Sequence, residues 1–227
     1  MSVSSVIIDA LTHALTSKGS ARIAFPGGRS AVALMDQLSQ TELDWSSVNV
    51  TLVDERAVDE SSDASNARLV KEKLLIQHAK SAKFEPLFIG DDATEAASVL
   101  NQREATLDVV VLGMGEDGHF ASLFPSDTPV TGLADTLDGF VATRAVGSPS
   151  VPRISMTLTR VLSAELVVLL VSSEEKKDKV MNGLIAMNPM NPMNPVSYLL
   201  VSDHPVVVAW PDGDIVTIQR GVIHESE

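Results

Sequence analysis

The stretch that decides the fold is VVVLGMGEDGHFASLF, residues 109–124. It begins with four aliphatic residues, Val109 to Leu112. An apolar run without a polar break is typical of a strand buried on both faces of a parallel sheet. Gly113, Gly115 and Gly118 then end the run. They predict a loop at the carboxyl end of this strand, which is where open α/β sheets bind their ligands.

The loop also carries the residues for chemistry, Asp117 and His119. Glycine has no Cβ, so such a loop can bring its backbone close to a ligand. Residues 113–118 also match the G-x-G-x-x-G dinucleotide fingerprint, which requires a long helix to start inside the motif. Pro125 follows too soon for more than two helical turns, so the match is weak evidence for a nucleotide.

Outward from this stretch, apolar strand-like segments alternate with segments of helical periodicity, and we expect a Rossmann-like α/β fold, a mainly parallel sheet with helices on both faces. No shift in composition marks a boundary, so we expect a single domain over residues 1–227. The expected helices are 6–18, 31–40, 65–79, 92–105 and 174–186, and the expected strands are 22–25, 48–53, 86–90, 107–113, 165–172 and 205–210.

The charge composition limits the classes of binding partner that we expect. Thirty Asp and Glu against 17 Lys and Arg give a net charge of -13. This field repels nucleic acid and anionic membranes, so neither is an expected partner. An anionic small molecule needs a local cluster of cations, which makes each arginine informative. No cysteine, no secretion signal and no long apolar run is found, and we expect a cytoplasmic protein.

Two further segments follow expected strands and carry candidate anion ligands. PGGRS, residues 26–30, precedes a helix, and its Gly27 and Gly28 amides, with Arg29 and Ser30, suit an anion. Asp54, Glu55 and Arg56 end the next strand, where three charges need water, partners or a ligand. An Asp–Arg pair that only holds a loop is an equally open reading of this motif, and Arg153 is interpreted either as a phosphate fork or as a surface cation.

Several chemistries find no support in the sequence. Asp54, Asp117 and His119 lack a metal-ligand spacing, and no metal site is predicted. The chain has neither a G-x-S-x-G elbow nor a nucleotide phosphate loop. The other four histidines are interpreted as structural, and the repeat MNPMNPMNP, residues 187–195, as a loop without chemistry of its own.

Six motifs occur in an order that resembles one family over nearly the full chain: PGGRS, LVDERAV with SNARLV, GMGEDGHFASLFP, PRISMTLT, SSEEKKDKV and NPVSYLL. The chain resembles the bacterial 6-phosphogluconolactonases of the pentose phosphate pathway. The resemblance implies a fold like that of glucosamine-6-phosphate deaminases and ribose-5-phosphate isomerases. It also implies hydrolysis of 6-phosphoglucono-δ-lactone without a metal or organic cofactor, with His119 catalytic and with Asp54 and Arg56 lining the pocket.

The deaminase branch of the same fold is the nearest alternative, but there the motifs resemble DEY and DGHIAFNEP. Here DER and DGHFASLFP favour the lactonase. The chain departs from the family in residues 147–155, GSPSVPRIS, which lack a lysine that many members carry. Arg153 or Lys176 is expected to replace that contact.

The expected mechanism is general-base hydrolysis, in which neutral His119 activates water at C1 and then protonates the ring oxygen. Either Asp54 or Asp117 orients the imidazole, and the sequence leaves this choice open. Amides from Gly113 to Gly115 are candidates for the oxyanion site. The remaining alternative is a non-catalytic sugar-phosphate-binding protein, and the sequence leaves the assembly open between a monomer and a small homo-oligomer. The residues expected to bind substrate are Gly27, Gly28, Arg29, Ser30, Arg56, Gly113, Gly115, Arg153 and Lys176.

Overall fold

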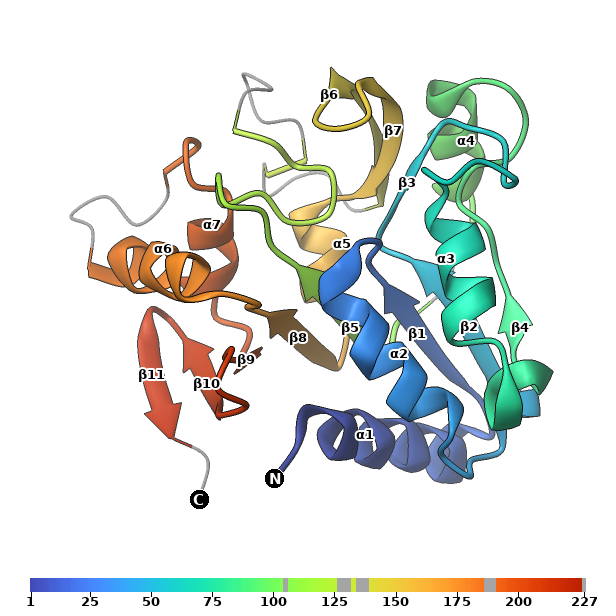
Figure 1. The fold of residues 1–227 in the computed structure, drawn as a ribbon, viewed down its shortest axis with the longest axis horizontal. Helices are drawn as coiled ribbons and strands as arrows, with labels where there is room; N and C mark the ends of the chain where they lie inside the picture. The colour runs from blue at the N-terminus through green and yellow to red at the C-terminus, as the bar shows by residue number, and fades with distance from the viewer. Residues whose placement is uncertain (104–105, 126–131, 134–138, 186–190, 226–227) are drawn as a thin grey trace.

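The computed structural model describes residues 1–103, 106–125, 132–133, 139–185 and 191–225. In this part of the chain, an eight-stranded sheet has the order β11-β10-β9-β8-β5-β1-β2-β4 (Figure 1). The six strands from β9 to β4 pair in parallel, while β10 and β11 pair in antiparallel fashion. The strands of this sheet are β1 (Ala21–Phe25), β2 (Val48–Leu52), β4 (Lys83–Phe84), β5 (Val109–Gly113), β8 (Leu166–Leu170), β9 (Val206–Ala209), β10 (Ile215–Gln219) and β11 (Val222–Glu225).

Helices cover both faces of the sheet because the strand residues alternate between two cores. In β5, Val109 and Val111 belong to one buried cluster, whereas Val110 and Leu112 belong to the other. The first cluster packs on α1 (Val3–Lys18), α2 (Val32–Ser39), α3 (Asn66–Lys73) and α4 (Ala93–Leu100). The second packs on α5 (Leu158–Leu162), α6 (Glu174–Ile185) and α7 (Val196–Leu200). The predicted α/β fold is confirmed.

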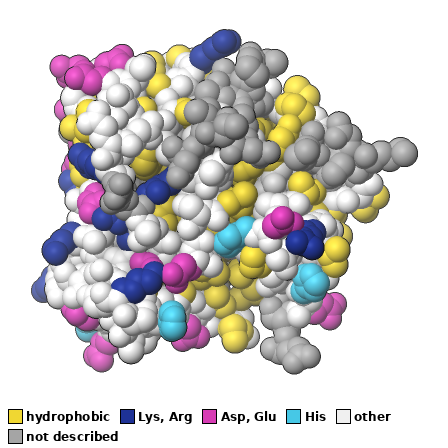
Figure 2. All heavy atoms as spheres, turned by 180° about the vertical axis from the view of Figure 1, so that it is seen from behind, with side chains coloured by type: hydrophobic (Ala, Val, Ile, Leu, Met, Phe, Trp, Pro, Cys, Tyr) yellow, Lys and Arg dark blue, Asp and Glu magenta, His cyan; other side chains and the backbone are white. Residues whose placement is uncertain are grey.

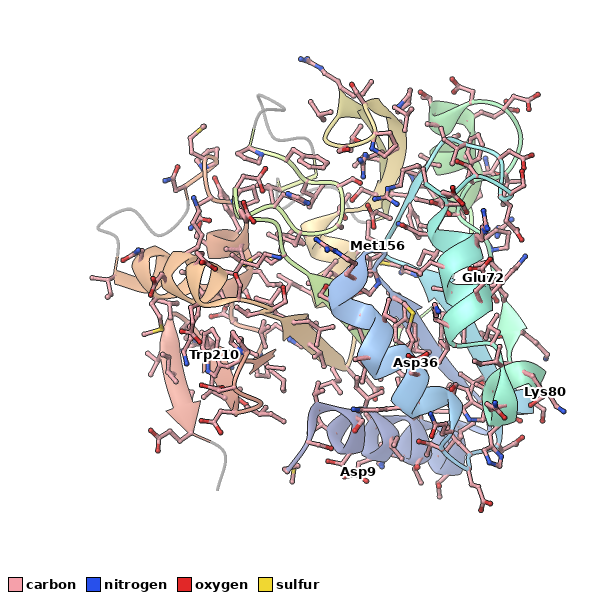
Figure 3. All side chains as sticks on the ribbon, in the orientation of Figure 1. Asp9, Asp36, Glu72, Lys80, Met156 and Trp210 are labelled. Atoms are coloured by element: carbon pink, nitrogen blue, oxygen red, sulfur yellow. The ribbon has the colours of Figure 1, made fainter. Side chains whose placement is uncertain are left out.

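Helix α1 illustrates how one helix meets this sheet. Ile7, Leu11 and Ala14 recur at helical spacing and are fully buried. Asp9 lies on the opposite side, exposed to solvent (Figure 3). Ser2 caps the amino end and Gly19, with a φ of 74°, ends the helix in the left-handed conformation. The helix therefore begins one turn earlier than its first predicted residue.

A second, three-stranded antiparallel sheet was not predicted. It contains β3 (Asp54–Arg56), β7 (Val151–Met156) and β6 (Phe140–Val146), in that order. Met156 lies at its end, where its amide donates to the carbonyl of Val53 at 2.8 Å (Figure 3). The DER motif is therefore a short strand paired with the PRIS motif, almost 100 residues away.

Three predicted elements differ from the structure for local reasons. Residues 86–90 are not a strand: the ladder with β2 ends at Glu85, whose amide donates to the carbonyl of Val50 at 2.8 Å, and Pro86 follows directly. The helix expected over 65–79 ends at Lys73, and Gln77 (φ 49°) begins a 3-10 helix, Gln77–Ser81, that buries Ala79. The parts of the expected helices at residues 104–105 and 186, and residues 187–190 of the repeat, lie outside the described residues.

The carboxyl-terminal hairpin of β10 and β11 was missed as well. Its turn contains Arg220 and Gly221, both with positive φ (52° and 73°), as a two-residue hairpin turn requires. An Asn-Gly or Asp-Gly pair would have predicted such a turn, but Arg-Gly does not.

Charged side chains of both signs lie on the face of the molecule that Figure 2 shows. Acidic and basic side chains are interspersed there. Within the described residues, no helix combines the length and the apolar character needed to cross a bilayer.

Candidate active site

A cavity of about 620 Å³ opens where β1, β2, β5 and β8 end. These four parallel strands are neighbours, so the loops that follow them meet at one edge of the sheet. The small sheet adds a further wall through β3 and β7. The cavity wall includes every predicted site residue except Asp117: Gly27, Gly28, Arg29, Ser30, Asp54, Arg56, Gly113, Gly115, His119, Arg153 and Lys176.

His119 is held by its neighbour in the same loop. Its Nδ1 lies 2.6 Å from Oδ1 of Asp117, and the same oxygen accepts the amide of His119 at 3.1 Å. Partial burial opposes ionisation of Asp117, but the hydrogen bond and charge of His119 outweigh it, so the pKa of Asp117 is lowered. An ionised Asp117 accepts the proton of Nδ1, which leaves Nε2 as the ring nitrogen available for chemistry.

The close packing within this loop explains why position 115 is a glycine. A Cβ on Gly115 would lie closer than 3.0 Å to both the His119 ring and the Asp117 carboxylate. The amide of Gly115 donates to the carbonyl of His119 at 2.9 Å. The prediction that the Gly115 amide belongs to the oxyanion site is therefore wrong, because that amide closes the loop instead.

Phe124 supports the imidazole from the side, a contact that the sequence analysis missed. The two ring centroids lie 4.2 Å apart with a tilt of 32°. The guanidinium of Arg153 lies over the same phenyl ring, 5.3 Å from its centroid. Phe124 thus packs between the candidate base and a buried cation.

Asp54 lies in the cavity wall but forms no hydrogen bond with His119 among the described residues. Its Oδ2 accepts the hydroxyl of Ser122 at 2.5 Å and lies 4.0 Å from Arg153. Its side chain is almost buried. Of the two acids considered for orienting the imidazole, the geometry places Asp117, and not Asp54, at Nδ1.

Two arginines face each other across the small sheet. Arg56 of β3 is directly opposite Arg153 of β7 in the antiparallel pair. Like charges at such a position repel each other, and the pKa of Arg153 is lowered by burial and then by the charge of Arg56. Among the described residues, the Nε atoms of both side chains are buried without a hydrogen-bond partner. Both residues line the cavity, so their positive charges would attract an anion there.

The remaining predicted ligands surround the same space. Gly28, with a φ of 85°, precedes a short 3-10 helix that contains Arg29 and Ser30 and leads into α2. Lys176 reaches from the first turn of α6, where its Nζ lies 3.1 Å from the hydroxyl of Ser172. Ser172, Ser173 and Glu116 also line the cavity; they lie in two of the quoted motifs, but none of them was predicted as a site residue. Among the described residues, no three His, Asp or Glu side chains gather as metal ligands.

This combination defines an α/β protein with a cationic cavity and a carboxylate-supported histidine. A family model described as glucosamine-6-phosphate isomerases/6-phosphogluconolactonase matches residues 1–208, and the chain belongs to this family. The 6-phosphogluconolactonase of Mesorhizobium japonicum is 37% identical over 210 residues, covering 90% of this chain and 87% of the relative. That of Pseudomonas aeruginosa is 38% identical over 206 residues, covering 88% and 85%.

The fold agrees with these relatives. A 6-phosphogluconolactonase crystal structure from Shewanella baltica has a TM-score of 0.81 and 33% identity, covering 92% of this chain and 91% of that one. The family resemblance predicted from the motifs is confirmed.

Proposed function

We propose that this chain hydrolyses 6-phosphoglucono-1,5-lactone to 6-phosphogluconate, the second step of the oxidative pentose phosphate pathway. The observation that supports this proposal is the position of the His119–Asp117 pair and of the two opposed arginines on one cavity. The pair suits acid–base chemistry on an ester, and the arginines suit the phosphate. The names of the curated relatives point to the same reaction.

In the proposed reaction, Nε2 of His119 takes a proton as the water oxygen forms a bond to C1. The tetrahedral intermediate then collapses, the bond between C1 and the ring oxygen breaks, and Nε2 returns its proton to that oxygen. Asp117 keeps the proton on Nδ1 and stabilises the transient imidazolium. General acid–base help of this kind is worth about 10² to 10⁴ in rate.

Arg56 and Arg153, with the Gly27–Gly28 loop, Arg29, Ser30 and Lys176, are proposed to hold the phosphate. The phosphate lies at the far end of the substrate from C1, so its binding contributes orientation more than bond chemistry. Asp54 is proposed to keep Arg153 in place and not to take part in proton transfer. The amide of Gly113 remains the candidate oxyanion donor from the predicted pair.

The proposal includes a single domain over residues 1–227, no metal or organic cofactor, and a cytoplasmic location as a monomer or small homo-oligomer. Two alternatives remain as outcomes of a test: deamination or isomerisation of another sugar phosphate, and ligand binding without catalysis.

The test measures hydrolysis of lactone generated in situ, corrected for spontaneous opening, with EDTA present. We expect wild-type activity to persist with EDTA and to fall by about 10² or more in His119→Ala. Unaccelerated hydrolysis by the folded wild type would reject the proposal, and glucosamine-6-phosphate turnover would then be measured. Activity that disappears with EDTA and returns with a divalent ion would reject the metal-free mechanism alone.

A further inference from the structure

Asn66 is a buried polar residue at the start of α3, and neither the motif analysis nor the proposed reaction gives it a role. Its relative exposure is 1%, yet it belongs to the cavity wall. A buried amide is costly unless both of its ends are hydrogen-bonded. The hydrogen-bond partners of its side chain therefore indicate which residues Asn66 keeps in position.

The side chain connects the first and the last residue of the DER strand. Its Nδ2 donates to the backbone carbonyl of Asp54 at 2.8 Å, and its Oδ1 accepts an Nη1 hydrogen of Arg56 at 2.6 Å. The carbonyl of Ala64 accepts from the same Nη1 at 2.8 Å. One nitrogen of the Arg56 guanidinium is therefore held from two sides, while its Nε has no partner among the described residues.

The backbone of Asn66 is held by a buried carboxylate. Its amide donates to Oε1 of Glu55 at 2.8 Å, and the amide of Ala67 donates to Oε2 at 2.7 Å. Glu55 is only 3% exposed, and Oε1 also accepts the amide of Arg56. The position of Asn66 thus depends on a rigid contact between β3 and the beginning of α3.

The anion loop packs on the same side chain. A Cβ on Gly27 would overlap with Oδ1 of Asn66, well inside 3.0 Å. Gly27 follows β1, whereas Arg56 ends β3, so these two cavity walls belong to different sheets. Asn66 touches both and sets the distance between them.

We propose that Asn66 is a positioning residue for phosphate binding, which orients Arg56 relative to the Gly27 loop. The inference rests on the proposed function, since it assigns Asn66 to the phosphate end of that substrate. It predicts that changes at Asn66 alter KM and product affinity while kcat stays close to that of the wild type.

The decisive variant is Asn66→Asp, which preserves shape. The new carboxylate would neutralise the charge of the Arg56 guanidinium. It would no longer donate a hydrogen bond to the carbonyl of Asp54, and it would lie beside the carboxylate of Asp54. We expect KM, and the Kd of 6-phosphogluconate measured by calorimetry, to rise about tenfold or more. We expect kcat to change by less than about threefold, since no reacting atom is touched. An unchanged KM and product Kd, or a loss confined to kcat, would overturn the inference.

Asn101→Asp is the matched control. Asn101 also packs against a glycine, Gly139, and bonds both ends of its amide to the backbone of Phe140 at 2.7 and 2.9 Å. It does not line the cavity, so its variant should keep the wild-type KM.

A double variant separates positioning from a general loss of structure. In an Arg56→Ala background, the uncharged substitution Asn66→Ser should raise the Kd of 6-phosphogluconate no further, because the group on which it acts is absent. An additive effect would contradict the inference. Should Asn66→Asp not fold, Asn66→Ser undergoes the same two measurements. Wild-type inactivity on the lactone would reject the proposed function, whereas product affinity would still decide the role of Asn66.

Discussion

The pairing of Asp117 with His119 leads to the sharpest prediction, the effect of Asp117→Asn. The substitution keeps an oxygen that can accept from Nδ1 and from the His119 amide, so the loop should persist. It removes the negative charge that faces the imidazolium formed during water attack. The Nδ1–Oδ1 distance of 2.6 Å places the two charge centres about 4 Å apart.

The magnitude follows from this distance and from the exposure of the pair. Opposite charges 4 Å apart attract by about 1 kcal/mol in water and about 4 kcal/mol at the effective dielectric constant of a protein surface. The Asp117 side chain is 45% exposed, so we take about 1 to 3 kcal/mol after screening. This corresponds to a fall in kcat of about 5- to 150-fold.

The assay is steady-state lactone hydrolysis with EDTA, and the expected loss lies in kcat with KM nearly unchanged. Glu116→Gln removes the same charge from the adjacent residue, which forms no hydrogen bond with His119 among the described residues. It thus measures the contribution of the general electrostatic field. A wild-type kcat in Asp117→Asn, or a loss equal to that of Glu116→Gln, would refute the assignment of Asp117. A large kcat loss in Asp54→Asn instead would return the role to Asp54.

Three further predictions test the loop, the buried carboxylate and a surface network. Gly115→Ala should lower kcat by about 100-fold or more, because the new Cβ displaces the imidazole; full turnover in the purified variant would contradict the close packing. Glu55→Gln should destabilise the fold by about 1 to 3 kcal/mol, because one oxygen that accepts an amide at the start of α3 becomes a donor. Calorimetry should then show a Tm lower by about 2 to 10 °C, and an unchanged Tm would argue against these bonds. The hydrogen bonds that Lys18 donates to Asp108 and Glu165 raise its pKa to about 12, so the stabilisation is complete below the usual pKa of 10.5 and is lost as the pH rises through 12. The Tm difference between the wild type and Lys18→Met should therefore shrink over that range, and a constant difference would exclude the linkage.

The sequence was sufficient to predict those elements whose signal lies within a few consecutive residues. The aliphatic run 109–112 and the glycines after it predicted β5 and its ligand loop, since strand burial and turn chemistry are encoded within a few residues. Order along the chain then placed the loops at one sheet edge, because parallel strands connected by helices end on the same side. The hairpin of β10 and β11 was missed because its Arg-Gly turn lacks the usual signal.

Pairing between distant segments was decided only in the tertiary structure. The sequence by itself determined that Asp54, Asp117 and His119 lie near one cavity, and it left open which acid meets the imidazole. That choice depends on the bend of a six-residue glycine loop at 113–118, which turns Asp117 back onto Nδ1. The opposition of Arg56 and Arg153 depends on the register of β3 against β7, and the proposed role of Asn66 depends on its contacts with β3 and with the loop after β1. The pairing of Arg56 with Arg153 joins residues far apart in the chain, so no local pattern of polarity can specify it.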